Sequence, residues 1–198
     1  MSPIELLVLG HITRDHIGGE QRLGGAAAYA SRVASCLGVQ TGLVTHAPLD
    51  SSLLSPLEAL PQLELETLAC HVPTTFELVY GPTGRSIKLL ERAPELEFKD
   101  IPERFLGAQA AYFAPVIGEC PLELVSALPS PIKVAGLQGW LRRAEPDGQI
   151  APITQFDINT IPTSLTAAVF SEEDHPHADE LARALSERIQ HVVLTRGA

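Results

Sequence analysis

Nearly continuous apolar runs constrain most strongly what this chain can fold into. Such runs are typical of strands that are covered on both faces, as in a parallel sheet with helices on either side. The sequence therefore predicts an α/β fold with a mostly parallel sheet. The runs are Ile4–Leu9, Thr41–Thr45, Ala110–Ala114, Ile132–Gly136, Ala167–Phe170 and Val192–Thr195.

Apolar residues recur at helical spacing between some of these runs. One such pattern covers Ala26–Leu37 and is followed by Gly38, a common helix stop. A second covers Ala178–Leu185 and lies between two of the predicted strands. The segment 167–195 therefore predicts a strand–helix–strand unit with a right-handed crossover.

Two segments depart from this alternation of strands and helices and predict a small projecting lid. Thr74–Tyr80 and Arg85–Leu90 flank the turn Gly81–Gly84, the pattern of a β-hairpin. A second extended piece is predicted between Asp15 and Leu23. We expect lid segments at about 12–23 and 74–91 of one domain, 1–198. The segments 47–61, 93–102 and 143–162 are expected to be loops or short connecting pieces.

Composition excludes several classes of partner. The formal net charge is −10 and only three lysines occur, so no basic stripe is available for nucleic acid. No apolar run is long enough to cross a membrane, and the N-terminus lacks the basic start of a signal peptide. Cys36, Cys70 and Cys120 are odd in number and far apart, which favours reduced thiols. We expect a cytoplasmic protein without nucleic-acid or membrane partners.

The segment around Gly24 and Gly25 is the most informative motif. Two glycines open an alanine-rich helix, so the backbone can approach a ligand closely and the helix N-terminus offers free N–H donors. The same pattern equally suits a tightly packed helix after a flexible turn. Before it, Asp15 follows the first predicted strand, at the sheet edge where open α/β folds bind ligands. Asp15 could accept hydrogen bonds from two hydroxyls of a polyol; a turn-capping aspartate is the alternative.

Taken together, these motifs resemble the ribokinase-like, or PfkB, family of carbohydrate and nucleoside kinases. The shared order is a strand, G-x-x-x-x-D ending at Asp15, a short extended stretch, Gly24-Gly25 opening a helix that ends in Leu37-Gly38, and a lid hairpin. The resemblance implies a doubly wound α/β domain with helices on both faces and a small β-lid. It further implies transfer of the ATP γ-phosphoryl group, with Mg²⁺, to a substrate hydroxyl.

The resemblance also assigns substrate-binding positions. Asp15, Gly24 and Gly25 match the positions that hold the acceptor, and Tyr29 stands where the family usually carries Asn. This departure argues against a standard ribose or fructose phosphate acceptor. Arg85 in the lid could reach a hydroxyl or phosphate, although a solvated strand arginine is the simpler interpretation.

Other segments of the chain add to the implied sites. Gln138 opens a Q-x-x-x-R segment that ends at Arg142 and is similar to inositol kinases of the family, which favours a cyclitol or other polyol. Ser171 and Asp174 take the places of the family's N-x-x-E, so Asp174 would act on Mg²⁺ indirectly. An N-cap serine with an acidic first turn is the alternative. Thr195 and Gly197 resemble a turn that approaches ATP phosphates.

The family's G-A-G-D segment, which supplies the general-base Asp, is expected downstream of Ala198. The resemblance thus implies a domain that is incomplete at its C-terminus and a 198-residue chain that is inactive alone. Exposed apolar surface would then promote self-association, and family members also form homodimers through the lid. We expect a kinase of a small sugar, an inositol-like polyol or a nucleoside. The alternative is a non-catalytic sugar- or polyol-binding protein of the same fold.

Overall fold

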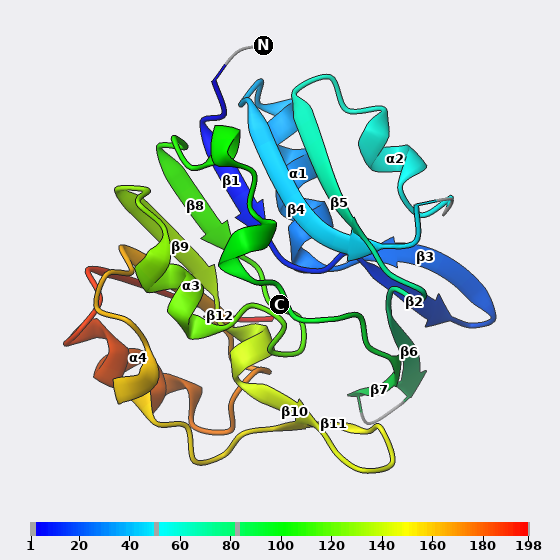
Figure 1. The fold of residues 1–198 in the computed structure, drawn as a ribbon. Coiled ribbons are helices and arrows are strands. Elements are labelled where there is room, and N and C mark those ends of the chain that lie inside the picture. The colour runs from blue at the N-terminus through cyan, green and yellow to red at the C-terminus, as the bar shows by residue number, and fades with distance from the viewer. Residues whose placement is uncertain (1–2, 50–51, 82–83, 198) are drawn as a thin grey trace.

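A seven-stranded, entirely parallel sheet forms the centre of the structure (Figure 1). The computed structural model describes residues 3–49, 52–81 and 84–197. The strand order β13-β12-β9-β8-β1-β4-β5 places β1 inside the sheet with later strands added on both sides, which is a doubly wound arrangement. The strands are β1 (Leu6–Leu9), β4 (Thr41–Ala47), β5 (Leu63–Ala69), β8 (Ala110–Phe113), β9 (Ile132–Gly136), β12 (Ala167–Ser171) and β13 (His191–Thr195).

The six strands that the apolar runs predict are all present in this sheet, together with the edge strand β5, which the runs do not predict. In β5, leucine alternates with glutamate, and every residue except Ala69 is partly buried. Such alternation is typical of a strand that has one face toward solvent. Arg104 covers the outer face by pairing with Glu64 and with Glu66, the latter at 2.8 Å.

Helices cover both faces of the sheet. Leu7 and Leu9 of β1 point into a core that also contains residues of α3 and α4, whereas Val8 points into a core with α1 and α2. In Figure 1, α3 and α4 lie on the viewer's side of the sheet and α1 lies behind it. The helices are α1 (Ala26–Cys36), α2 (Ser55–Glu58), α3 (Leu122–Ala127) and α4 (Ala178–Ser186). Single turns of 3₁₀ helix occur at η1 (Phe98–Asp100), η2 (Glu103–Phe105), η3 (Gln138–Trp140) and η4 (Ile158–Thr160).

The two predicted lid segments form one four-stranded sheet, which we call the lid sheet. Its order is β3-β2-β6-β7, and the parallel pairing of β2 with β6 joins the two hairpins. Phe76 and Leu78 on its inner face pack against Val116 and Ile117 after β8, so the lid sheet has an apolar core of its own. The strands are β2 (Thr13–Ile17), β3 (Glu20–Gly24), β6 (Thr74–Gly81) and β7 (Gly84–Glu91).

The expectation of a loop over 143–162 is wrong in its first part. β10 (Arg142–Ala144) and β11 (Ile150–Pro152) form an antiparallel hairpin there. The hairpin also contacts the lid sheet, because Leu89 N donates to Gly148 O at 2.8 Å. Its strands are only three residues long and depend on this distant contact, which a local sequence pattern does not reveal.

An apolar groove lies beside α1. It has a volume of about 670 Å³ and is lined by Leu6, Tyr29, Val33, Leu37, Tyr112 and Val134 among others. Val33 is 60% exposed and Leu37 75% exposed. None of the described helices is both long and apolar enough to span a membrane.

We expect the groove to make this chain self-associate as its concentration rises, because contact between copies removes apolar surface from water. Val33→Glu should shift the weight-average mass in sedimentation toward the 21.2 kDa of one chain. Leu49→Glu is the matched control, since Leu49 is 65% exposed and does not line the groove. A wild-type mass that does not change with concentration would contradict the expectation.

Candidate functional site

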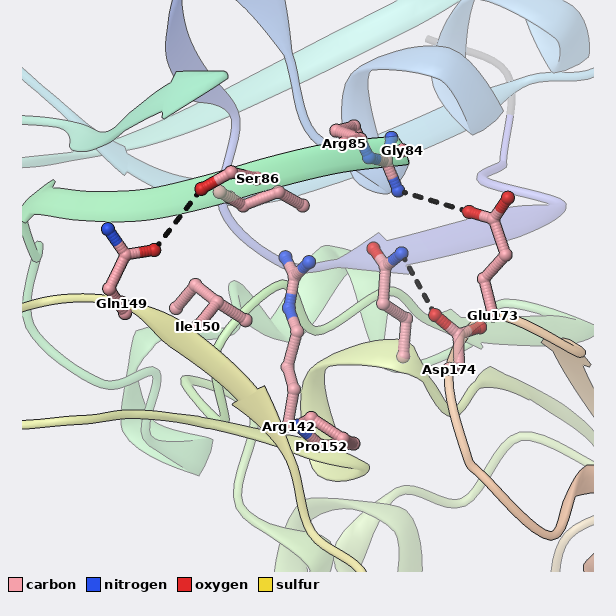
Figure 2. A pocket seen from close by; sticks show the side chains of 11 residues that line it. Gly84, Arg85, Ser86, Arg142, Gln149, Ile150, Pro152, Glu173 and Asp174 are labelled. Atoms are coloured by element: carbon pink, nitrogen blue, oxygen red, sulfur yellow. Dashed lines mark hydrogen bonds and ion pairs between the residues drawn. The ribbon is translucent and has the colours of Figure 1, made fainter. Parts of the chain in front are cut away.

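Two adjoining cavities lie between the lid sheet and the carboxyl ends of the parallel strands. The lid cavity has a volume of about 300 Å³, and its walls include Thr13, Asp15, Tyr29 and Phe76. The hairpin cavity has a volume of about 440 Å³ and is bounded by β7, the β10–β11 hairpin and the segment after β12 (Figure 2). Both lie where doubly wound folds bind ligands. The wall shared by the two cavities consists of Arg85, Ile87, Gln138 and Arg142.

Asp15 lines the lid cavity from the lid sheet. Asp15 lies within β2, inside the lid segment expected at about 12–23, and pairs with Arg22 of β3 and Phe76 of β6. The alternative of a turn-capping aspartate is wrong, because Asp15 lies inside a strand. Thr13 Oγ1 donates to Asp15 Oδ1 at 2.8 Å. Burial raises the pKa of Asp15, although the Thr13 hydrogen bond and the nearby Arg142 oppose this change.

Gly24 and Gly25 have different packing roles. A Cβ at Gly24 would overlap the Asp15 carboxylate, so this glycine makes room for the acidic side chain. Gly25 has a φ of 91°, and a Cβ there would overlap the backbone oxygen of His11. Gly25 also lines the lid cavity at the start of α1. The structure therefore supports both interpretations of the motif, because both glycines allow tight packing and Gly25, unlike Gly24, also lines the lid cavity.

The remaining predicted substrate-binding residues reach the same cavity. Tyr29 lines it from α1 and stays 59% exposed. Arg85 enters from β7, and its guanidinium lies 3.6 Å from the Glu173 carboxylate. Gln138 lies in η3, where its Nε2 donates to Asp174 Oδ1 at 3.2 Å (Figure 2). The structure thus brings these predicted residues together with Asp15 around one cavity.

Arg142 completes the wall, and it was not among the predicted site residues. Its Nε donates to Val116 O at 2.6 Å, and its guanidinium lies 5.2 Å from the centre of the Phe76 ring. Burial lowers the pKa of Arg142 to about 10, although Asp174 and Glu119 oppose this change. The Q-x-x-x-R spacing from Gln138 carried the signal that could have identified it.

Glu119 is a fully buried carboxylate that holds this wall in place. Its oxygens accept hydrogen bonds from His11 N at 3.0 Å, Val116 N at 2.9 Å and Ile117 N at 2.8 Å. It therefore ties the chain leaving β1 to the chain leaving β8. Sequence reasoning missed Glu119; the signal was a single glutamate in the otherwise apolar stretch 113–120.

The four predicted cofactor-binding residues fall into two pairs: Ser171 and Asp174 lie at and after the end of β12, and Thr195 and Gly197 lie at and after the end of β13. Asp174 lines the hairpin cavity, where its Oδ2 accepts from Ser171 N at 2.7 Å. The alternative of Ser171 as an N-cap is wrong, because Ser171 ends β12 and the N-cap of α4 is His177. Thr195 and Gly197 line neither of the two cavities.

The segment around Gly197 has donors suited to an anion. Gly197 N donates to Glu172 Oε1 at 2.9 Å, and Arg196 Nη1 lies 3.5 Å from Glu172 Oε2. A backbone amide and a guanidinium that bind a carboxylate could also bind a phosphate oxygen. Among the residues that the structure describes, no cluster of three or more His, Cys, Asp or Glu side chains is placed to hold a metal ion.

Comparisons with known proteins support the fold. No protein-family model and no curated protein matches the chain. Among solved structures, a pyrophosphate-dependent kinase of the ribokinase family in a sulfate complex superposes with a TM-score of 0.83 at 20% identity, covering 96% of this chain and 73% of that one. A pyrophosphate-dependent kinase of the same family, with a pyrophosphate analogue and myo-inositol, gives 0.81 at 19% identity over 98% and 73%. Ribokinase from Thermotoga maritima gives 0.65 at 15% identity over 98% and 72%.

We predict that Glu119→Gln lowers the free energy of unfolding by about 3 kcal/mol. The side-chain NH₂ group of glutamine cannot accept hydrogen bonds, so backbone N–H groups that bind Glu119 would lose their acceptor. Urea unfolding measures this change. The matched control is Glu123→Gln, at an exposed glutamate, which should change stability by less than about 0.5 kcal/mol. Equal effects of the two substitutions would contradict the role of Glu119.

We predict that Asp15→Asn stabilises the free protein at neutral pH. The raised pKa of Asp15 in the folded state means that its ionisation opposes folding, and asparagine removes this cost. The gain should shrink as the pH falls through the folded-state pKa toward the ordinary value of 3.8. Thermal unfolding across this range measures it, with Asp147→Asn as the control, because Asp147 is exposed and also accepts one hydrogen bond. A gain that is independent of pH would contradict the prediction.

Proposed function

We propose that this chain, which has the ribokinase-like fold, binds the acceptor of a phosphoryl-transfer reaction in the lid cavity. The acceptor is a small hydroxylated molecule: a sugar, an inositol-like polyol or a nucleoside. The observation that carries the proposal is the position of Asp15, a desolvated carboxylate in a cavity between a β-lid and the carboxyl edge of a doubly wound sheet.

The walls of the lid cavity suit a ring with hydroxyl groups. Asp15 accepts one hydrogen bond from Thr13, which leaves acceptor capacity for ligand hydroxyls. Phe76 and Leu78 offer apolar surface for the C–H faces of a ring, and Tyr29 borders the opening. The lid sheet forms one side of the cavity through Asp15, Phe76 and Leu78.

The donor is proposed to be ATP with Mg²⁺, which supplies the transferable phosphoryl group. Ser171, Asp174, Thr195 and Gly197 would lie toward the donor, Asp174 from the hairpin cavity and Gly197 through its backbone amide. Pyrophosphate is a second candidate donor, since two structural neighbours are pyrophosphate-dependent kinases. The charge that develops on the phosphoryl group needs cationic or N–H donors, and Arg196 and Gly197 N are of this kind.

Non-catalytic binding of a sugar or polyol is the second candidate function. Among the described residues, Asp15 is the only carboxylate that lines the lid cavity. The general-base aspartate that a kinase of the resembled family uses is not among the described residues that line this cavity. A protein that only binds a polyol has no need of a second carboxylate there.

Calorimetry with sugars, polyols and nucleosides tests binding, and a phosphoryl-transfer assay with ATP or pyrophosphate in the presence of Mg²⁺ tests turnover. The native protein should bind a polyol and consume donor only when that polyol is present. Binding without turnover would favour the non-catalytic function. Failure of every hydroxylated ligand to bind would overturn both.

Asp15→Ala should weaken binding of the acceptor about 10-fold or more, because hydrogen bonds to a charged group are lost. The change is measured by calorimetry at constant pH and salt. Asp147→Ala, which removes an exposed aspartate that lines neither cavity, should leave the affinity unchanged. Equal affinities of the wild-type and Asp15→Ala proteins would place the acceptor elsewhere.

A further inference from the structure

Arg142 combines burial with unused hydrogen-bonding capacity. In the described part of the chain its one hydrogen bond runs from Nε to Val116 O, which leaves the two terminal nitrogens without a protein acceptor. Among the residues that the structure describes, no carboxylate forms an ion pair with Arg142; Asp174 and Glu119 act on it from farther away. A partly buried guanidinium without a direct ion pair is unfavourable, because the more distant carboxylates of Asp174 and Glu119 offset only part of the lost hydration.

A second cation in the same wall increases this cost. Arg85 also lines both cavities, and its positive charge opposes the charged form of Arg142. Figure 2 shows the Arg142 side chain extending toward β7, while a dashed line joins Arg85 to Glu173. Gln138 Nε2 in turn donates to Asp174 Oδ1. The nearby carboxylates of Glu173 and Asp174 thus already have other partners.

We infer that Arg142, assisted by Arg85, binds an anionic substituent of the acceptor, a carboxylate or a phosphate monoester. The inference rests on the proposed acceptor-binding function and narrows its substrate class to anionic polyols and sugars. Asp15 on the lid sheet would bind hydroxyls of such a molecule, and the guanidinium groups of the shared wall would bind its charge. The flat fork of N–H donors in Arg142 suits two oxygens of one anion.

The position of Arg142 favours an anion carried by the acceptor over an anion of the donor. Its guanidinium lies over the Phe76 ring, and Phe76 lines the lid cavity but not the hairpin cavity. An anion bound there would share the lid cavity with the groups that Asp15 binds. A free inorganic anion such as pyrophosphate has the same chemistry, so the experiment tests it separately.

Matched pairs of probes test the inference by calorimetry at fixed ionic strength: D-galacturonate against D-galactose, and myo-inositol 1-phosphate against myo-inositol. The wild-type chain should bind the anionic member of at least one pair about 10-fold more tightly. Arg142→Gln should abolish this preference by lowering the affinity for the anionic member about 10-fold more than the affinity for the neutral member. Arg142→Lys, which keeps the charge but lacks the fork, should retain part of it.

Arg143→Gln is the matched control, because Arg143 is adjacent, has a 56% exposed side chain and pairs with Glu145. It should leave the preference unchanged, and thermal unfolding shows whether each variant is folded. Equal affinity for neutral and anionic members would overturn the inference and leave the proposed function intact. Absence of binding by all four probes and by other hydroxylated ligands would overturn both. Pyrophosphate alone binding with the same dependence on Arg142 would assign the site to a donor and overturn the inference.

Discussion

The carboxylate of Glu119 links the central sheet to the wall of the candidate site. It accepts hydrogen bonds from backbone N–H groups after β1 and after β8, and so fixes the two segments relative to each other. Val116, one of its partners, accepts the hydrogen bond of Arg142. A buried carboxylate is stable only when hydrogen-bond donors surround it. The backbone after β1 and β8 must therefore keep its N–H groups directed at Glu119. Through its hydrogen bond to Val116, the Arg142 guanidinium is positioned at the cavity by the same contacts.

The two sides of the lid cavity come from different parts of the fold. The rigid side is the carboxyl edge of the parallel sheet, where the segments after β8 and β9 supply Val116, Gln138 and Arg142. The other side is the lid sheet with Asp15, and Gly24 allows the carboxylate to lie close against β3. Asp15 and Arg142 thus belong to opposite sides of the cavity, and Arg85 of β7 adds a second cation on the lid side. Such an arrangement can orient a ligand that has both hydroxyl groups and a negative charge.

The sequence predicted the parts of the structure that depend on local patterns. Apolar runs predicted six of the seven sheet strands, although only the interior strands are well covered and the edge strand β13 stays partly exposed. Gly24-Gly25 predicted a tight helix start, and Gly25 borders a cavity. The β10–β11 hairpin was missed because it depends on a contact between Gly148, in its own turn, and Leu89 of the lid sheet. Glu119 and Arg142 were missed because burial decides their roles. A glutamate that accepts backbone hydrogen bonds looks the same in sequence as one on the surface.

A crystal structure of this chain with a bound polyol or sugar acceptor tests the central claim most directly. The account predicts the ligand in the lid cavity, with hydroxyl groups within hydrogen-bond distance of the Asp15 carboxylate and its remaining polar groups toward Gln138 and Arg142. A ligand bound outside this cavity, or one in it without contact to Asp15, would contradict the account.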